Sequence, residues 1–440
     1  MKPPLKSIWY LPLVLIASLS SHGEDFFFHN GDRVIFLGDS ITEQRLYTTY
    51  IEAYALTRHP DWHLWFRNVG WGGDTSWLRQ RSHPNEDQLF AADSSEQQKM
   101  VQDSVGQGLQ RDVLPLKPTA VTVDFGMNDH EYQAFRPDIF RAYIRSQTEI
   151  AKDLQDAGAR VAFLTPQPIE EKRPDPDKDV RNISLRKFSD GLKEVAGKTG
   201  TVFVDQFDPY MEILVRERVG NPADLVGGGN AVHPGPIGHT LMAWSILKQL
   251  GAPPLVSRAV IDASDSRVTA SEGCQILNLK VSGKTIGFDR LDQALPMPID
   301  PRAQPALKLA PILRDLDQYM LQVTGAGEGS YELSIDGEPV GQATAADLAM
   351  GWNLAAHAGP ITKQAESVLQ LVFQKNDLYF ERWRNVQLYR FPAWATTAET
   401  TQLRETELAR LDQEIANKEA AIDAKRKPSL HHFELKPSGP

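Results

Sequence analysis

Ser40 is the residue of this sequence best placed to do chemistry. It follows the apolar run Val34–Leu37 and the turn residues Gly38 and Asp39, and the apolar spacing of residues 43–51 suits a helix. A serine between a strand and a helix is held clear of the core, beside backbone N–H groups and the positive helix end. Gly-Asp-Ser is also ordinary turn chemistry. Ser40 is therefore a candidate nucleophile that needs partners from elsewhere in the chain.

Three later stretches contain residues that could complete such a site. The stretch 68–75 holds Gly70, Gly72 and Gly73, where a backbone without Cβ atoms can point N–H groups at a ligand. The predicted strand 121–125 leads into Gly-Met-Asn-Asp and so places the Asn128 amide at the same sheet edge as Ser40. His233 lies in a Gly/Pro-rich loop ahead of a predicted helix, not on an apolar helix face. The four stretches together contain a nucleophile, a base and hydrogen-bond donors.

These stretches, in this order between Arg33 and Leu250, resemble the SGNH hydrolase superfamily, also called GDSL esterases and lipases. The resemblance implies a flavodoxin-like three-layer α/β/α fold and ester hydrolysis without a metal or organic cofactor. It also implies that Ser40 is the nucleophile and His233 the general base. The N–H groups of Ser40 and Gly73 and the side-chain amide of Asn128 would then form the oxyanion hole.

One position departs from the family pattern. The aspartate usually found three residues before the histidine is Asn230 here, and an asparagine can orient the ring but carries no charge to stabilise the imidazolium. Three hypotheses follow. Asn230 is a weaker orienting residue of an active enzyme, another carboxylate takes its place, or the domain binds without catalysing. The candidate replacement carboxylates are Asp205, Asp208 and Asp224.

Composition and the amino-terminal sequence narrow the class of protein. The net charge of −10 argues against a nucleic-acid-binding surface. Lys2 and Lys6 precede a short apolar run and then small and polar residues, which is typical of a secretory signal peptide over residues 1–23. The alternative is an uncleaved anchor. We expect a secreted or periplasmic protein without stable membrane insertion after cleavage.

Cys274 is the single cysteine, which excludes an intramolecular disulfide.

The pattern of apolar and turn-forming residues divides the rest of the chain into three regions. Residues 24–253 alternate apolar runs with helical stretches, which predicts a mostly parallel sheet covered on both faces. Residues 254–358 are strand-like with frequent turns, including a hairpin around Asp336-Gly337. Residues 359–440 have helical periodicity and end in an amphipathic helix, which we expect to pack on the protein or, less simply, to form an oligomer seam.

The substrate is expected to be an acylated small molecule or polysaccharide. Tryptophans near the glycine-rich stretch could stack on sugar rings or could simply be core residues; they are Trp62, Trp65, Trp71 and Trp77. With the predicted export and the β-rich region, the sequence looks similar to the carbohydrate-esterase branch of the superfamily. A carbohydrate O-deacetylase is therefore the leading hypothesis. A lipase or lysophospholipase and a non-catalytic glycan-binding protein are the alternatives.

Overall fold

The computed structural model describes residues 26–172, 174–221 and 225–438. The predicted signal peptide, residues 1–23, and the candidate carboxylate Asp224 lie outside these residues.

A parallel five-stranded sheet forms the centre of the first domain, with strand order β2-β1-β3-β4-β5. The strands are β1 (Arg33–Gly38), β2 (Trp65–Asn68), β3 (Ala120–Asp124), β4 (Arg160–Leu164) and β5 (Val202–Val204). This order is that of flavodoxin-like folds, whose ligands bind beyond the carboxyl ends of the strands. The predicted α/β class and three-layer architecture are confirmed. Strand β2 was not predicted.

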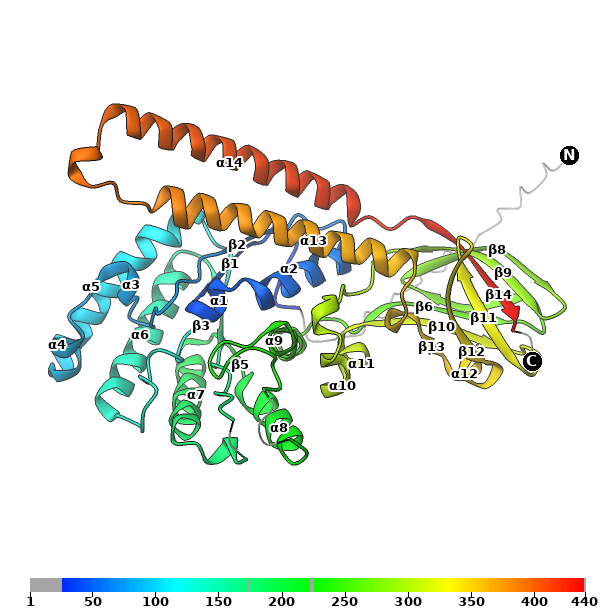
Figure 1. Ribbon diagram of the computed structural model, residues 1–440, viewed down its shortest axis with the longest axis horizontal. Coiled ribbons are helices and arrows are strands. Elements are labelled where there is room, and N and C mark those ends of the chain that lie inside the picture. The colour runs from blue at the N-terminus through cyan, green and yellow to red at the C-terminus, as the bar shows by residue number, and fades with distance from the viewer. Residues whose placement is uncertain (1–25, 173, 222–224, 439–440) are drawn as a thin grey trace, which may run out of the picture.

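Helices cover both faces of this sheet (Figure 1). On one face, α2 (Leu46–Arg58), α8 (Phe207–Arg218) and α9 (Pro236–Gln249) pack against sheet residues such as Phe36 and Leu164. On the other face, α5 (Ser94–Asp112), α6 (Pro137–Asp156) and α7 (Val180–Thr199) pack against alternate residues such as Ile35 and Val123. Both faces are apolar because both are buried, which explains the near-continuous hydrophobic runs in the sequence. Short helices α1 (Ser40–Glu43), α3 (Arg79–Ser82) and α4 (Glu86–Ala91) lie in the connections.

A β-sandwich follows the α/β domain. Its first sheet has the order β13-β10-β6-β7 and its second the order β12-β11-β14-β9-β8. The strands are β6 (Leu255–Asp262), β7 (Arg267–Glu272), β8 (Cys274–Ser282), β9 (Thr285–Asp292), β10 (Gln318–Thr324), β11 (Ser330–Ile335), β12 (Glu338–Thr344), β13 (Trp352–Asn353) and β14 (Leu430–Pro437). Apolar residues of both sheets, such as Leu321 and Phe433, share one core. The predicted hairpin is β11–β12.

Residues 359–440 were predicted to be helical, and this prediction is wrong for the final part of the region. Helix α13 (Pro360–Phe380) continues as a π-helical segment, Glu381–Gln387, and α14 (Ala398–Lys425) returns antiparallel beside α13 (Figure 1). The chain then forms β14, which enters the sandwich between β11 and β9. Phe433 and Leu435 alternate with polar neighbours and point into the sandwich core, so this segment has the two-residue period of a strand.

Helix α13 is tied to the α/β domain by a buried ion pair. Lys375 Nζ lies 2.5 Å from Glu52 Oε1 of α2, and Asn376 Nδ2 donates to Glu52 Oε2 at 3.0 Å. Less than a twentieth of either charged side chain is exposed. A second contact joins α14 to β2, where Arg67 lies 2.8 Å from Glu419. The α13–α14 hairpin is thus fixed to the α/β domain, whereas β14 is fixed to the sandwich. In the described part of the chain, no helix is long and apolar enough to span a membrane.

Replacing Lys375 by methionine tests this attachment. The variant leaves Glu52 buried without its cationic partner, a change that costs on the order of 3–5 kcal/mol in the free energy of unfolding. Lys363→Met on the same helix removes an exposed ion pair with Glu338 and should cost about 1 kcal/mol at most. Denaturant titration of both variants measures the difference. Equal, small losses would mean that the Lys375–Glu52 pair does not anchor α13.

Candidate active site

Ser40 lies at the carboxyl end of β1 as the first residue of α1. The helix approaches the strand end so closely that a Cβ atom at Gly38 would lie 2.1 Å from Thr42 Oγ1 and 2.7 Å from the Asp124 carbonyl oxygen. A Cβ atom at Gly70 would meet the Glu43 backbone nitrogen at 2.3 Å. These two glycines therefore serve the close approach of α1. Asp39 accepts a hydrogen bond from the Ile41 N–H at 2.9 Å and caps the turn.

The structure brings Ser40 and His233 together. Ser40 Oγ lies 2.8 Å from His233 Nε2, although the two residues are 193 positions apart. The histidine loop is held by Gln167, whose side-chain amide donates to the Val232 carbonyl at 2.9 Å. Burial lowers the pKa of His233 from its usual value of 6.5, because the charged imidazolium is less well solvated there. The neutral ring can accept the Ser40 proton.

Asn230 supports the histidine loop rather than the imidazole ring. Its Oδ1 accepts hydrogen bonds from the backbone N–H groups of Val232 and His233, both at 2.9 Å. Such a side-chain turn fixes the backbone that carries His233, but it leaves the ring itself to other contacts. Ring orientation by Asn230 was one of three hypotheses, and the hydrogen bonds of Asn230 in the structure go to the loop backbone instead.

Neither of the two replacement carboxylates that the structure describes bonds to the His233 ring. Asp205 accepts the Asp208 N–H at 3.1 Å, and Asp208 forms an ion pair with Arg186. The lowered pKa of His233 agrees with this, since an adjacent carboxylate would raise it. Across the described residues, the Ser40–His233 pair therefore has no third, acidic member.

The three predicted oxyanion-hole residues come from segments that contact one another, namely the Ser40 turn, the glycine-rich loop and the end of β3. Within the described part of the chain, the N–H groups of Ser40 and Gly73 have no hydrogen-bond acceptor. Gly73 has a φ of +75°, which glycine adopts without strain. Asn128 Nδ2 donates to the Asp74 carbonyl at 2.9 Å and makes a longer contact of 3.3 Å with Asp39 Oδ2. Asn128 thus joins the end of β3 to the glycine-rich loop and to the Ser40 turn.

Sequence reasoning missed Tyr132 as part of this site. Its hydroxyl donates to Asn128 Oδ1 at 2.9 Å and so directs the amide N–H groups toward the glycine-rich loop. The residue follows Asn128 by four positions in an irregular connection, where no periodic pattern marks it.

Buried carboxyl groups beneath Ser40 were also missed. Burial raises the pKa of Asp39 well above its usual value, that of Asp124 to about 7 and that of Asp129 to about 6. A fourth group, Asp74, lies 3.0 Å from the Arg81 guanidinium. Neutral or paired carboxyls add less negative charge beneath the site than four free carboxylates would. This limits repulsion of a negatively charged oxygen formed near Ser40.

The tryptophans near the glycine-rich stretch are not an open sugar platform, contrary to one interpretation of the sequence. Trp77 is fully buried, and Trp62 stacks on His59 with ring centroids 3.7 Å apart. The Arg33 and Arg67 guanidinium groups lie over the Trp65 ring. Trp71 is covered by Arg384, whose guanidinium carbon is 3.8 Å from the ring centroid. All four rings make packing contacts inside the protein, and Trp71 is the one of the four that also lines a cavity.

Residues 36–241 match the GDSL-like lipase/acylhydrolase family. The match covers most of the α/β domain and confirms the resemblance drawn from the four sequence stretches.

Two solved structures show how far the likeness extends. A gut microbial diltiazem-metabolizing enzyme is 25% identical, with a TM-score of 0.77, and the match covers 93% of this chain and 98% of that one. An acetylxylan esterase from Geobacillus stearothermophilus is 19% identical, with a TM-score of 0.38 over 51% of this chain and 96% of its own. No curated protein is significantly similar to this chain. The first likeness includes regions beyond the α/β domain.

Substitution of Asn230 tests its role in supporting the loop. Asn230→Asp keeps both backbone acceptor bonds, and we expect aryl acetate hydrolysis to change by less than about tenfold. In a serine protease, loss of the charge of the triad aspartate lowers kcat by about 10⁴-fold. Asn230→Ala removes both bonds, each worth about 1 kcal/mol, and should lower kcat more. A gain of several orders of magnitude in Asn230→Asp would instead show that residue 230 acts on the imidazole ring.

Proposed function

We propose that this protein is a serine esterase that hydrolyses short-chain acyl esters, with Ser40 as nucleophile and His233 as general base. The observation that carries the proposal is the 2.8 Å separation between Ser40 Oγ and His233 Nε2 within an acylhydrolase-family domain. Neutral imidazole at hydrogen-bond distance is what a serine hydroxyl needs in order to attack a carbonyl.

The reaction would proceed in two halves. Ser40 Oγ attacks the ester carbonyl while His233 takes the hydroxyl proton, and His233 then returns a proton to the leaving alcohol. In the second half, His233 takes a proton from water as the water oxygen attacks the acyl-enzyme carbonyl. His233 then returns that proton to Ser40 Oγ as the bond to the acyl group breaks and the carboxylic acid leaves. The N–H groups of Ser40 and Gly73 and the Asn128 amide would stabilise the oxyanion in both halves. None of the residues that the structure describes places a carboxylate on the ring, so among them the imidazolium would be stabilised by the position of the histidine loop and by nearby dipoles.

The proposed substrate is an acetylated carbohydrate. A cavity of about 810 Å³ borders the glycine-rich loop at Trp71, and its lining is mainly arginine, hydroxyl-bearing and aromatic side chains. A fatty acyl chain needs an aliphatic groove, whereas saccharides suit polar groups interspersed with aromatic rings. This favours a deacetylase over a lipase.

The Ser-His assignment is tested by hydrolysis of 4-nitrophenyl acetate with the protein lacking residues 1–23. Ser40→Ala and His233→Ala should each lower kcat by roughly 10⁴-fold or more, because each removes half of the proton-transfer pair. Ser367→Ala, at a half-buried serine on α13 whose hydroxyl donates to the Lys363 carbonyl, is the matched control and should retain activity. An inactive wild-type protein that retains acetylated glycans would support the glycan-binding alternative instead.

The pH dependence of kcat/KM tests whether His233 lacks an acidic partner. Because burial lowers its pKa, the ring stays neutral to lower pH, and activity should fall with a midpoint below 6.5 as the ring is protonated. An ion pair with a carboxylate would move that midpoint above 6.5. Because burial raises the pKa of Asp124 to about 7, Asp124→Asn is the control, and the fall of activity at low pH should persist in it.

A further inference from the structure

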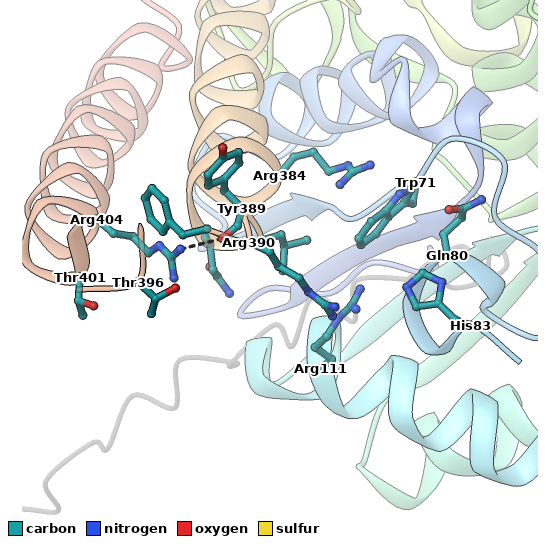
Figure 2. Close-up of a pocket in the computed structure, with 13 residues that line it drawn as sticks. Trp71, Gln80, His83, Arg111, Arg384, Tyr389, Arg390, Thr396, Thr401 and Arg404 are labelled. Carbon is teal, nitrogen blue, oxygen red and sulfur yellow. Dashed lines mark hydrogen bonds between the residues drawn. The ribbon is translucent and has the colours of Figure 1, made fainter. Parts of the chain in front are cut away.

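The cavity beside the glycine-rich loop is formed jointly by the α/β domain and the C-terminal hairpin. Trp71, His83 and Arg111 line it from the α/β domain, and Arg384, Tyr389 and the start of α14 line it from the hairpin (Figure 2). Its volume of about 810 Å³ lies within the range of small-molecule sites.

The charge of this cavity contrasts with that of the whole chain. Although the net charge is −10, no aspartate or glutamate is among the described residues that line the cavity. Its basic side chains come from separate segments and are His83, Arg111, Arg384, Arg390 and Arg404. Asp112 and Glu43 pair with Arg111 and Arg384 from outside the lining, so Arg390 and Arg404 carry most of the positive potential of this concave surface.

Arg390 and Arg404 keep hydrogen-bond capacity for an anionic ligand. Arg390 makes no ion pair or hydrogen bond to any other residue that the structure describes, and it points toward Arg111 in Figure 2. Arg111 is already engaged, because it donates to both Asp112 carboxylate oxygens at 3.0 and 2.8 Å and to the Arg81 carbonyl at 2.8 Å. Arg404 donates to the Tyr389 carbonyl at 2.7 Å, while its buried Nε has no hydrogen-bond partner. Converging guanidinium groups repel one another unless an anion lies between them.

The cavity is connected to the candidate active site through Glu43. The Gly72 N–H donates to Glu43 Oε2 at 2.9 Å, and Arg384 Nε lies 3.4 Å from Glu43 Oε1. Glu43 itself belongs to α1, three residues after Ser40. On the other side, Gln80 lines the cavity, and its Nε2 would lie 3.3 Å from a Cβ atom at Gly73. Glu43 and Gln80 therefore join the cavity to the loop that carries Gly72 and Gly73, although Ser40 itself does not line the cavity.

We propose that this cavity binds the carboxylate groups of an acidic saccharide whose acyl ester lies at Ser40, an inference that rests on the proposed esterase function. The planar guanidinium fork matches a carboxylate in a bidentate manner. Tyr389, Thr396 and Thr401 supply aromatic and hydroxyl groups for a sugar between the charges. The C-terminal hairpin thus selects the substrate, and uronate-containing oligosaccharides are the preferred class.

Binding is measured first, without catalysis, by calorimetric titration of Ser40→Ala with trigalacturonate, galactotriose and inorganic sulfate. Trigalacturonate should bind at least about tenfold more tightly than either control, and its affinity should fall as ionic strength rises. Arg390→Gln in the same background should weaken trigalacturonate binding about tenfold. Arg410→Gln, an exposed position on α14 outside the cavity, should leave that affinity unchanged. Equal affinity for sulfate, or equal affinity for galactotriose, would overturn the proposal.

Turnover is measured next with O-acetylated trigalacturonate and O-acetylated galactotriose. The ratio of their kcat/KM values should favour the acidic substrate in the active protein and fall about tenfold in Arg390→Gln, but not in Arg410→Gln. If trigalacturonate binds and neither ester is hydrolysed, the esterase function fails while the acidic-saccharide site stands. If both esters are hydrolysed with equal kcat/KM, the esterase function stands and the acidic-saccharide site is refuted.

Discussion

Helix α1 lies against the ends of β1 and β2 with no space for a Cβ atom at Gly38 or Gly70. The rest of the site depends on this contact. It brings the Ser40 N–H to the sheet edge, lets Asp39 reach both the turn and Asn128, and positions Glu43 beside Gly72. A single methyl group at either glycine would have to displace backbone atoms, which well-packed interiors resist. The Gly-Asp-Ser sequence is therefore a packing requirement as well as a source of the nucleophile.

The sequence predicted the structure best where the hydrophobic pattern of a segment matches its burial in the folded protein. Strands β1, β3 and β4 are buried on both faces, so their apolar runs predicted both the elements and the sheet edge where Ser40 and Asn128 meet. Strand β2 escaped prediction because its four residues include Arg67 and Asn68. These polar residues are buried only because they bond to partners far along the chain, Glu419 and Thr48. Such pairings leave no periodic signal.

The same limit applies to side chains whose roles depend on distant segments. The role of general base could be predicted for His233 because the Gly/Pro-rich stretch around it resembles a family motif. The contact of Asn230 with the loop backbone instead of the ring depends on a local turn geometry that the residue type does not specify. The basic cavity could not be predicted, since its arginines become neighbours only when α13 and α14 fold back over the α/β domain. The buried Lys375–Glu52 pair that fixes this placement joins positions 323 residues apart.

Strand β14 lies inside the second sheet of the sandwich, between β11 and β9, although it follows both long helices in the chain. During synthesis the α/β strands and their helices emerge before residue 250, so that domain can begin to fold while the ribosome is still working. The sandwich cannot close until α13 and α14 have been made and β14 arrives, and β9 and β11 expose unpaired edges for that interval. Long-range pairing of this kind slows folding and exposes strands to aggregation. Synthesis of the α13–α14 hairpin therefore sets the earliest moment at which the sandwich can be completed.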